Sequence, residues 1–235
     1  MIKLLFTTNP RISNILLSNL ELKEINIDSQ WDFKVYRNAS VILFESPASD
    51  KAFRSAMIFA FSEYNPDLYF YVWESLAVST EINAWDIILP NVLFEYNPSI
   101  NDTQISKDNR DSFSWMPIFI ENYDLQNDYD FENFGLRVGW ITVSSQEFDF
   151  KALEFDKLRL AYEADVVDDF SYFFIDEAKK MQILDKTYVV LWVVDKDEAI
   201  ALDHISHIVN FLMENISWEY IKQDDSLEFN EDEDE

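Results

Sequence analysis

Short, uninterrupted apolar runs alternate with segments of helical periodicity along most of this chain. The strand-like runs are Ile2–Thr7, Ala39–Glu45, Leu68–Trp73 and Lys186–Val193. Runs of this kind are typical of strands that are buried on both faces of a sheet. Because helical segments separate them, the sequence predicts an α/β fold with helices on both faces of the sheet.

Four segments repeat apolar residues at the spacing of an α-helix. They are Arg11–Leu22, Ser49–Tyr64, Val166–Gln182 and Asp203–Ile216. Ser49 offers a side-chain oxygen that can cap the second of these helices. We therefore expect a helix at each segment.

The remaining segments are less regular. We expect strands at Trp31–Tyr36 and within Phe134–Ser144, and two more, Asp86–Pro90 and Val92–Tyr96, around a bend at Pro90. The polar stretch Asn97–Asn127 predicts a long loop that could act as a lid.

The composition excludes several classes of site. The chain has 235 residues, enough for one domain with a substantial core, but only two glycines and no cysteine. Disulfides, thiol nucleophiles and cysteine zinc sites are therefore excluded, and glycine-rich phosphate loops are nearly so. His204 and His207 share one helix face but have no assignable third ligand, so we expect no metal and no cofactor.

The charge is strongly acidic, with a formal net charge of −27. Such a surface repels nucleic acid and anionic lipid, so we expect neither as a partner. No apolar stretch is long enough to span a membrane and no signal peptide precedes the first strand, so we expect a cytoplasmic protein. We predict an α/β domain over residues 1–220 and an acidic disordered tail over residues 221–235.

Three stretches in the same order resemble the nucleoside phosphorylase/nucleosidase superfamily. The first is Val41–Asn91, where the family has a strand ending in Gly-Ser-Ala-Gly-Gly and then a Gly-Asp-Ile-Val-Ile strand. The second, Trp140–Phe150, is similar to a segment ending Ala-Ser-Gly-Asp-x-Phe. The third, Ala164–Met181 followed by Tyr188–Glu198, is similar to an Ala-Val-Asp-Met-Glu helix start and a later Ser-Asp strand end.

The resemblance implies a fold and a chemistry. The fold is a three-layer αβα sandwich with a central mixed sheet, as in purine nucleoside phosphorylases and methylthioadenosine/S-adenosylhomocysteine nucleosidases. The chemistry is cleavage of an N-ribosidic bond. Asp195 matches the aspartate that protonates the purine, or it is a plain aspartate at the strand end that caps a turn. Phe148 matches the aromatic residue that packs on the base, or it is simply a core residue.

Other site positions depart from the family. Phe170 replaces the glutamate that binds ribose hydroxyls, and Asp169 beside it should compensate poorly, because adjacent helix residues point about 100° apart. Arg11 lies near the position of the water-activating glutamate. Its guanidinium cannot act as a base but could bind phosphate. Glu74, in the former glycine-rich turn, would fill the site together with Trp73 and repel phosphate.

Trp73, Trp85 and Trp140 stand at positions where the family usually has glycine, and Trp192 stands where it sometimes does. One interpretation is a pocket filled by aromatic side chains. The other is a source organism that reads UGA as glycine.

The leading interpretation of these patterns is a divergent nucleosidase-like protein that binds a purine nucleoside or base, with weak or no catalysis. The alternatives are an active purine N-ribosyl hydrolase or phosphorylase, and an acidic scaffold for protein interactions. The resemblance also implies a homodimer or a larger homo-oligomer.

Overall fold

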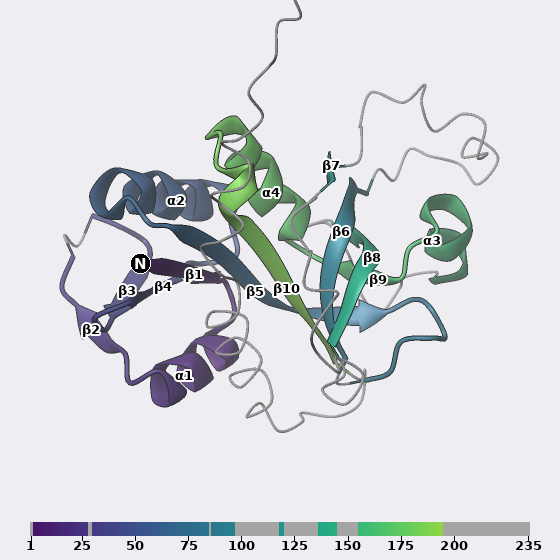
Figure 1. Ribbon diagram of the computed structural model, residues 1–235, viewed down its shortest axis with the longest axis horizontal. Coiled ribbons are helices and arrows are strands. Elements are labelled where there is room, and N and C mark those ends of the chain that lie inside the picture. The colour runs from purple at the N-terminus through teal and green to yellow at the C-terminus, as the bar shows by residue number, and fades with distance from the viewer. Residues whose placement is uncertain are drawn as a thin grey trace, which may run out of the picture.

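A computed structural model describes residues 2–27, 30–84, 86–96, 118–119, 136–144 and 155–194 of the chain. A ten-stranded mixed sheet lies at its centre. Helices α2 (Asp50–Tyr64) and α4 (Ser171–Lys180) cover one side of the sheet, and α1 (Pro10–Asn19) covers the other (Figure 1). The architecture is therefore the three-layer α/β sandwich that the sequence predicted.

The apolar runs form the parallel centre of the sheet. Strand β1 (Lys3–Thr7) lies between β4 (Val41–Glu45) and β5 (Leu68–Ala77) and is parallel to both. Strand β10 (Thr187–Val193), buried at every residue, pairs with β5 in parallel. At one edge, β3 (Lys34–Arg37) and β2 (Lys23–Ile25) continue the sheet in antiparallel fashion.

The other half of the sheet curls back on itself. Strand β6 (Ile87–Glu95) pairs with β10, with β8 (Leu136–Ser144) and with the short β7 (Ile118–Phe119). Strand β9 (Val166–Asp168) lies between β8 and β5. Because β5 contacts both β9 and β10, the strands β5, β10, β6, β8 and β9 form a closed ring of pairings.

Two helices begin at side-chain caps that the sequence provides. Asn9 caps α1, where Pro10 takes the first helical position, and Ser49 caps α2. Asn65 ends α2 in the left-handed conformation, with φ of 40°. Helix α3 (Phe155–Tyr162) precedes β9 in the chain. A 3₁₀ turn at Leu184–Lys186 leads into β10.

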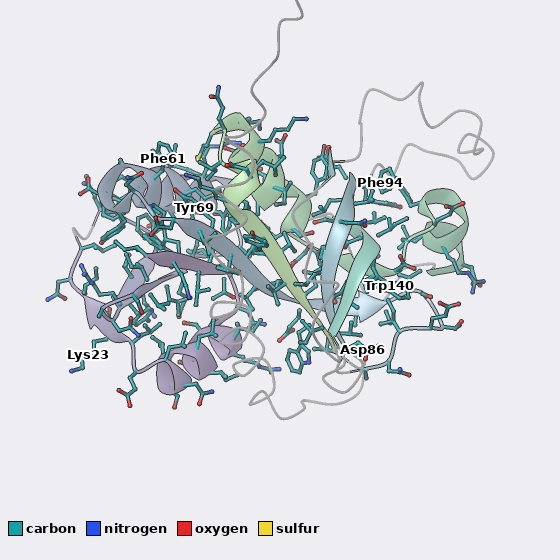
Figure 2. The ribbon with its side chains drawn as sticks, viewed as in Figure 1. Lys23, Phe61, Tyr69, Asp86, Phe94 and Trp140 are labelled. Atoms are coloured by element: carbon teal, nitrogen blue, oxygen red, sulfur yellow. The ribbon has the colours of Figure 1, made fainter. Side chains whose placement is uncertain are left out.

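Aromatic rings hold α2 and α4 against the sheet. The Phe53 ring of α2 contacts Phe6 of β1, at 5.7 Å, and Phe174 of α4, at 5.8 Å. Tyr71 of β5 stacks on Phe174 at 5.2 Å. By contrast, Phe61 lies on the outer side of α2 and is 44% exposed (Figure 2). In the described part of the chain no helix is long and apolar enough to cross a membrane, and α2, the longest, has 15 residues.

Two sequence predictions need correction. The segment Val166–Gln182 is not one helix: Val166–Asp168 is a strand, and the helix begins at Ser171. The β-branched pair Val166 and Val167 fits a buried strand, and the Asp168 side chain ends it. Pro90 does not separate two strands either, because β6 is continuous and the pairing register with β8 shifts around Pro90.

Smaller differences concern element boundaries. The strand expected from Trp31 begins at Lys34. Two short elements, β2 with three residues and α3 with eight, have no counterpart among the sequence predictions. The predicted helix Asp203–Ile216, the acidic tail 221–235, and all but Ile118–Phe119 of the predicted loop Asn97–Asn127 lie outside the described residues.

Candidate functional site

The carboxyl ends of several strands meet at one edge of the sheet. Phe6 of β1 lies opposite Tyr71 of β5, and Val193 of β10 lies opposite Ser75. Strand β9 runs antiparallel to β5 with Val167 opposite Leu76, so the residues after β9 come beside the Trp73–Ser75 segment. Ligands of α/β proteins bind at such an edge, and the residues gathered there form the candidate site.

Glu74 is held by the segment that follows β1. Its Oε1 accepts a hydrogen bond of 2.7 Å from the Asn9 side-chain amide. The Asn9 backbone N–H in turn donates to Thr7 Oγ1 at 3.2 Å, and the Asn9 side-chain oxygen accepts from the Arg11 backbone N–H at 2.8 Å. The Arg11 side chain is exposed at the beginning of α1. Asn9 therefore caps the helix and orients a partly buried carboxylate at the same time.

Asp168 is a completely buried carboxyl that organises the turn between β9 and α4. Its Oδ1 accepts from Ser144 Oγ at 3.0 Å and from the backbone N–H groups of Phe170 and Ser171 at 2.8 and 2.7 Å. Its Oδ2 accepts from Thr142 Oγ1 at 3.0 Å and from Ser171 Oγ at 2.5 Å. Burial raises the pKa of Asp168, and these hydrogen bonds oppose the rise. Its role is therefore to join β8, β9 and α4.

Asp169, the next residue, is in a different situation. Its Oδ1 is buried and has no hydrogen-bond partner in the protein. Burial and the neighbouring Asp168 raise the pKa of Asp169 to about 7, with a smaller contribution from Glu74 and an opposing one from the Trp73 indole N–H. A carboxyl group of this kind can hold or release a proton near neutral pH.

Trp73, Tyr71 and Thr8 complete the site on the α4 side of β5. The partly exposed Trp73 ring stacks on the buried Tyr71 ring, with centroids 6.3 Å apart and an interplanar angle of 19°. The hydroxyls of Tyr71 and Thr8 are both buried without a hydrogen-bond partner of good geometry in the protein. Burial, then the charges of Asp169 and Asp168, raise the pKa of Tyr71, whereas the Thr8 hydroxyl beside it opposes the rise.

Phe170 lies in the hydrophobic core. Its ring contacts Phe53 at a centroid distance of 4.9 Å and Phe173 at 5.1 Å, and its side chain is 2% exposed. The expectation that Asp169 and Phe170 are adjacent helix residues is wrong, because α4 begins only at Ser171. In the turn before the helix, the Phe170 side chain packs inward while Asp169 lies beside Trp73.

The structure thus brings Glu74 and Asp169 to one site and places Phe170 in the core and Arg11 on the surface. Asp195 and Phe148 lie outside the described residues; the last described residue before Asp195, Val194, donates its backbone N–H to Ser75 O at 2.9 Å. Sequence reasoning missed Thr8, Tyr71 and Asp168. Thr8 and Asp168 carry a recognisable signal, a polar residue at the end of a buried apolar run.

The arrangement favours some ligands over others. The carboxyl groups of Glu74, Asp168 and Asp169 make the edge acidic, which disfavours phosphate and favours neutral hydroxyl or amine groups that donate hydrogen bonds. Trp73 adds an aromatic face on which a planar group can stack. Among the described residues, no three histidine or acidic side chains are placed to hold a metal ion.

Comparisons with known proteins identify the fold. No protein-family model and no curated protein sequence matches this chain. The structure is similar to 5′-methylthioadenosine nucleosidase of Arabidopsis thaliana, with a TM-score of 0.70, 11% identity, and coverage of 93% of this chain and 97% of that one. It is also similar to Helicobacter pylori MTAN (TM-score 0.67, 10% identity, 92% and 98% covered) and futalosine hydrolase (0.66, 10%, 92% and 98%). The chain therefore has the fold of the nucleoside phosphorylase/nucleosidase superfamily.

Proposed function

We propose that this protein binds a purine nucleoside at the edge where β1, β5, β9 and β10 end, with weak or no cleavage of the glycosidic bond. The observation that carries the proposal is the meeting of Asn9, Trp73, Glu74 and Asp169 at this edge of a nucleosidase fold. A similarly folded Helicobacter pylori MTAN holds 5′-methylthioadenosine in its active site, which supports a ligand of this class.

The chemistry of the site suits the two halves of a nucleoside. The Trp73 ring offers a stacking surface for a base, and the carboxyl groups of Glu74 and Asp169 can accept hydrogen bonds from sugar hydroxyls. On the resemblance to the family, Phe148 packs on the base and Asp195 forms a hydrogen bond with it. An anionic phosphate fits poorly among these carboxylates, so the bare nucleoside is the preferred ligand.

Weak turnover follows from the groups that replace the family's machinery. Phe170, at the position of a sugar-binding glutamate, is a core residue and can accept no hydrogen bond. Arg11, near the position of the water-activating glutamate, is exposed and permanently protonated, so it cannot act as a base. Neither of these positions therefore provides a group that could activate the attacking water.

Asp169 favours a second candidate, an N-ribosyl hydrolase. Its pKa of about 7 suits a group that gives a proton to a departing base at neutral pH. In this candidate, proton donation by Asp169 or Asp195 would sustain cleavage even without the family's ribose-binding glutamate.

One screen tests both candidates. Thermal shifts are measured with adenosine, inosine, methylthioadenosine, adenine and phosphate, and free base is quantified in the same samples by chromatography. Stabilisation by nucleosides without release of base is the expected result. Base release that disappears in Asp169→Asn or Asp195→Asn would instead establish the hydrolase. No response to any nucleoside or base would overturn both candidates and leave an acidic scaffold for protein interactions.

A further inference from the structure

The acidic side chains of the candidate site have no ion-pair partner in the described part of the chain. Glu74 Oε1 accepts a hydrogen bond of 2.7 Å from the Asn9 side-chain amide, which is a neutral donor. None of the ion pairs among the described residues includes Glu74, Asp168 or Asp169. The described part of the chain therefore leaves the negative charge at this edge unbalanced.

These negative charges act on one another. The charges of Asp168 and Glu74 both raise the pKa of Asp169, and the charges of Asp169 and Asp168 raise the pKa of Tyr71. The whole chain adds to this potential, because its formal net charge is −27. Carboxylates that repel one another are stabilised by a positive charge placed close to them. The electrostatics of the site therefore favour a cation.

Trp73 and Ser75 add two features on one face of β5. Residues two apart on a strand point to the same side of the sheet, so Ser75 shares the α4 side with Trp73. The Ser75 side chain is 2% exposed, and its hydroxyl has no hydrogen-bond partner in the described part of the chain. The partly exposed Trp73 ring stacks on Tyr71, and the electron-rich face of an indole attracts cations as well as planar groups. A buried, unpaired hydroxyl beside such a ring points to a partner from outside the chain.

The charge and the aromatic ring are departures of this chain from the family it resembles. Trp73 and Glu74 belong to the segment where that family has Gly-Ser-Ala-Gly-Gly, which contains neither an acidic nor an aromatic residue. A preference that depends on these two side chains therefore belongs to this chain and does not follow from the fold.

We propose that the site selects a nucleoside that carries a positive charge, through the Glu74 carboxylate and the face of the Trp73 ring. This inference rests on the proposed function and names the class of its ligand. Asn9 is a positioning residue, because its amide holds Glu74 while its side-chain oxygen caps α1. A neutral nucleoside gains only neutral hydrogen bonds at the same place, and these are roughly half as strong as hydrogen bonds that involve a charge.

Two pairs of nucleosides of matched shape test the proposal. At pH 7, 1-methyladenosine carries a positive charge, whereas its isomer N6-methyladenosine is neutral. In the second pair, 5′-amino-5′-deoxyadenosine has an ammonium group where adenosine has a hydroxyl. Affinities are measured by calorimetry at one ionic strength. The wild type is expected to bind the cationic member of at least one pair about 10-fold more tightly than the neutral member.

Three variants assign that preference to the site. Glu74→Gln keeps the shape of the side chain and removes its charge, so the affinity ratio within the pair should fall to about one. Asn9→Ser keeps an oxygen that can cap α1 but loses the amide that holds Glu74, so the ratio should fall by about 3-fold. The matched control is Glu63→Gln, because Glu63 is an exposed residue of α2 and its loss changes the net charge equally. This control should keep the wild-type ratio.

Several results would overturn the inference. If the wild type bound the cationic member of neither pair more tightly, charge selection would be rejected and the proposed function would stand. A preference that survives in Glu74→Gln would reject the role of Glu74. An equal loss in Glu63→Gln would assign the preference to the net charge of the molecule. If the wild type bound none of the four nucleosides, both the charge selection and the proposed function would fail.

Discussion

The surroundings of Asp169 and of Trp192 determine how each side chain contributes to the free energy of unfolding. The Asp169 carboxyl faces Asp168, Glu74, Tyr71 and the Trp73 indole, and its charged form is favoured by its own backbone N–H and by the indole. Trp192, in contrast, is a buried apolar residue on β10. Each leads to a prediction about a single substitution.

Asp169→Asn should stabilise the protein at alkaline pH. The pKa of Asp169 is about 7 in the folded protein and 3.8 ordinarily, so the folded state binds a proton that the unfolded state releases. The stability due to this proton is fully present below the ordinary pKa and is lost as the pH rises through 7. At pH 8 the variant should therefore be more stable by up to about 4 kcal/mol, a difference that vanishes near pH 4. Urea unfolding at several pH values measures it, and a constant difference would contradict the prediction.

Trp192→Gly should destabilise the protein severely. The ring is 3% exposed, and its removal leaves a cavity and a flexible strand residue, which together cost about 3–5 kcal/mol. Equilibrium unfolding in urea gives the loss, and Phe61→Ala on the exposed side of α2 serves as the control. A glycine variant as stable as the wild type would favour the interpretation that UGA is read as glycine at such positions.

At the scale of elements, one ion pair joins α2 to α4. The Arg54 guanidinium donates two hydrogen bonds of 2.9 Å to Glu177 and lies 5.5 Å from the centre of the Phe173 ring. The Glu177 side chain is 6% exposed. Lys180 also donates to Glu177, at 2.8 Å. Burial raises the pKa of Glu177, but Arg54 and Lys180 outweigh it and the net shift is downward.

Arg54→Ala should therefore lower stability by about 1–3 kcal/mol, less than for a fully buried pair because the arginine is half exposed. A double-mutant cycle with Glu177→Gln measures the coupling. Because the pKa of Glu177 is lowered, the coupling should be present above the ordinary value of 4.5 and decline as the pH falls below it. Lys34→Ala, which breaks the exposed Lys34–Glu45 pair, should have a smaller effect, and equal losses would contradict this account.

At the scale of the whole molecule, the closed ring of strands places the candidate site. Because β5 is ten residues long, it can pair with β1 along its first part, with β10 along most of its length and with β9 at its end. The ring brings the β9–α4 turn to the edge where β1 also ends. Homo-oligomerisation, which the resemblance implies, stays a prediction.

Removing residues 221–235 should leave the fold intact. The last twelve residues of this segment carry eight acidic side chains and no basic one, so we expect like charges to repel along it and to keep it from contributing to a core. A chain ending at residue 220 is expected to melt at the same temperature as the full chain and to have the same subunit number by light scattering. A lower melting temperature would show that the acidic segment packs on the domain.

Local pattern was sufficient for the framework of this protein. Uninterrupted apolar runs identified β1, β4, β5 and β10, because strands buried on both faces need no polar alternation. Helical spacing identified α1 and α2 to within three residues at each end, and for α2 the capping residue Ser49 was identified as well. The sequence also determined the fold class, and the resemblance in its motifs agrees with the structural neighbours.

Long-range pairing decided the rest. The segment after Ala164 is helical by periodicity, yet Val166–Asp168 forms a strand because β5 and β8 offer hydrogen bonds on both sides of it. That change moves Phe170 into the core and leaves Asp169 beside Trp73. Whether a carboxyl group is saturated, like Asp168, or free, like Asp169, depends on neighbours at distant sequence positions. A single sequence specifies the residue types at such a site, but only the folded chain sets their distances, burial and pKa values.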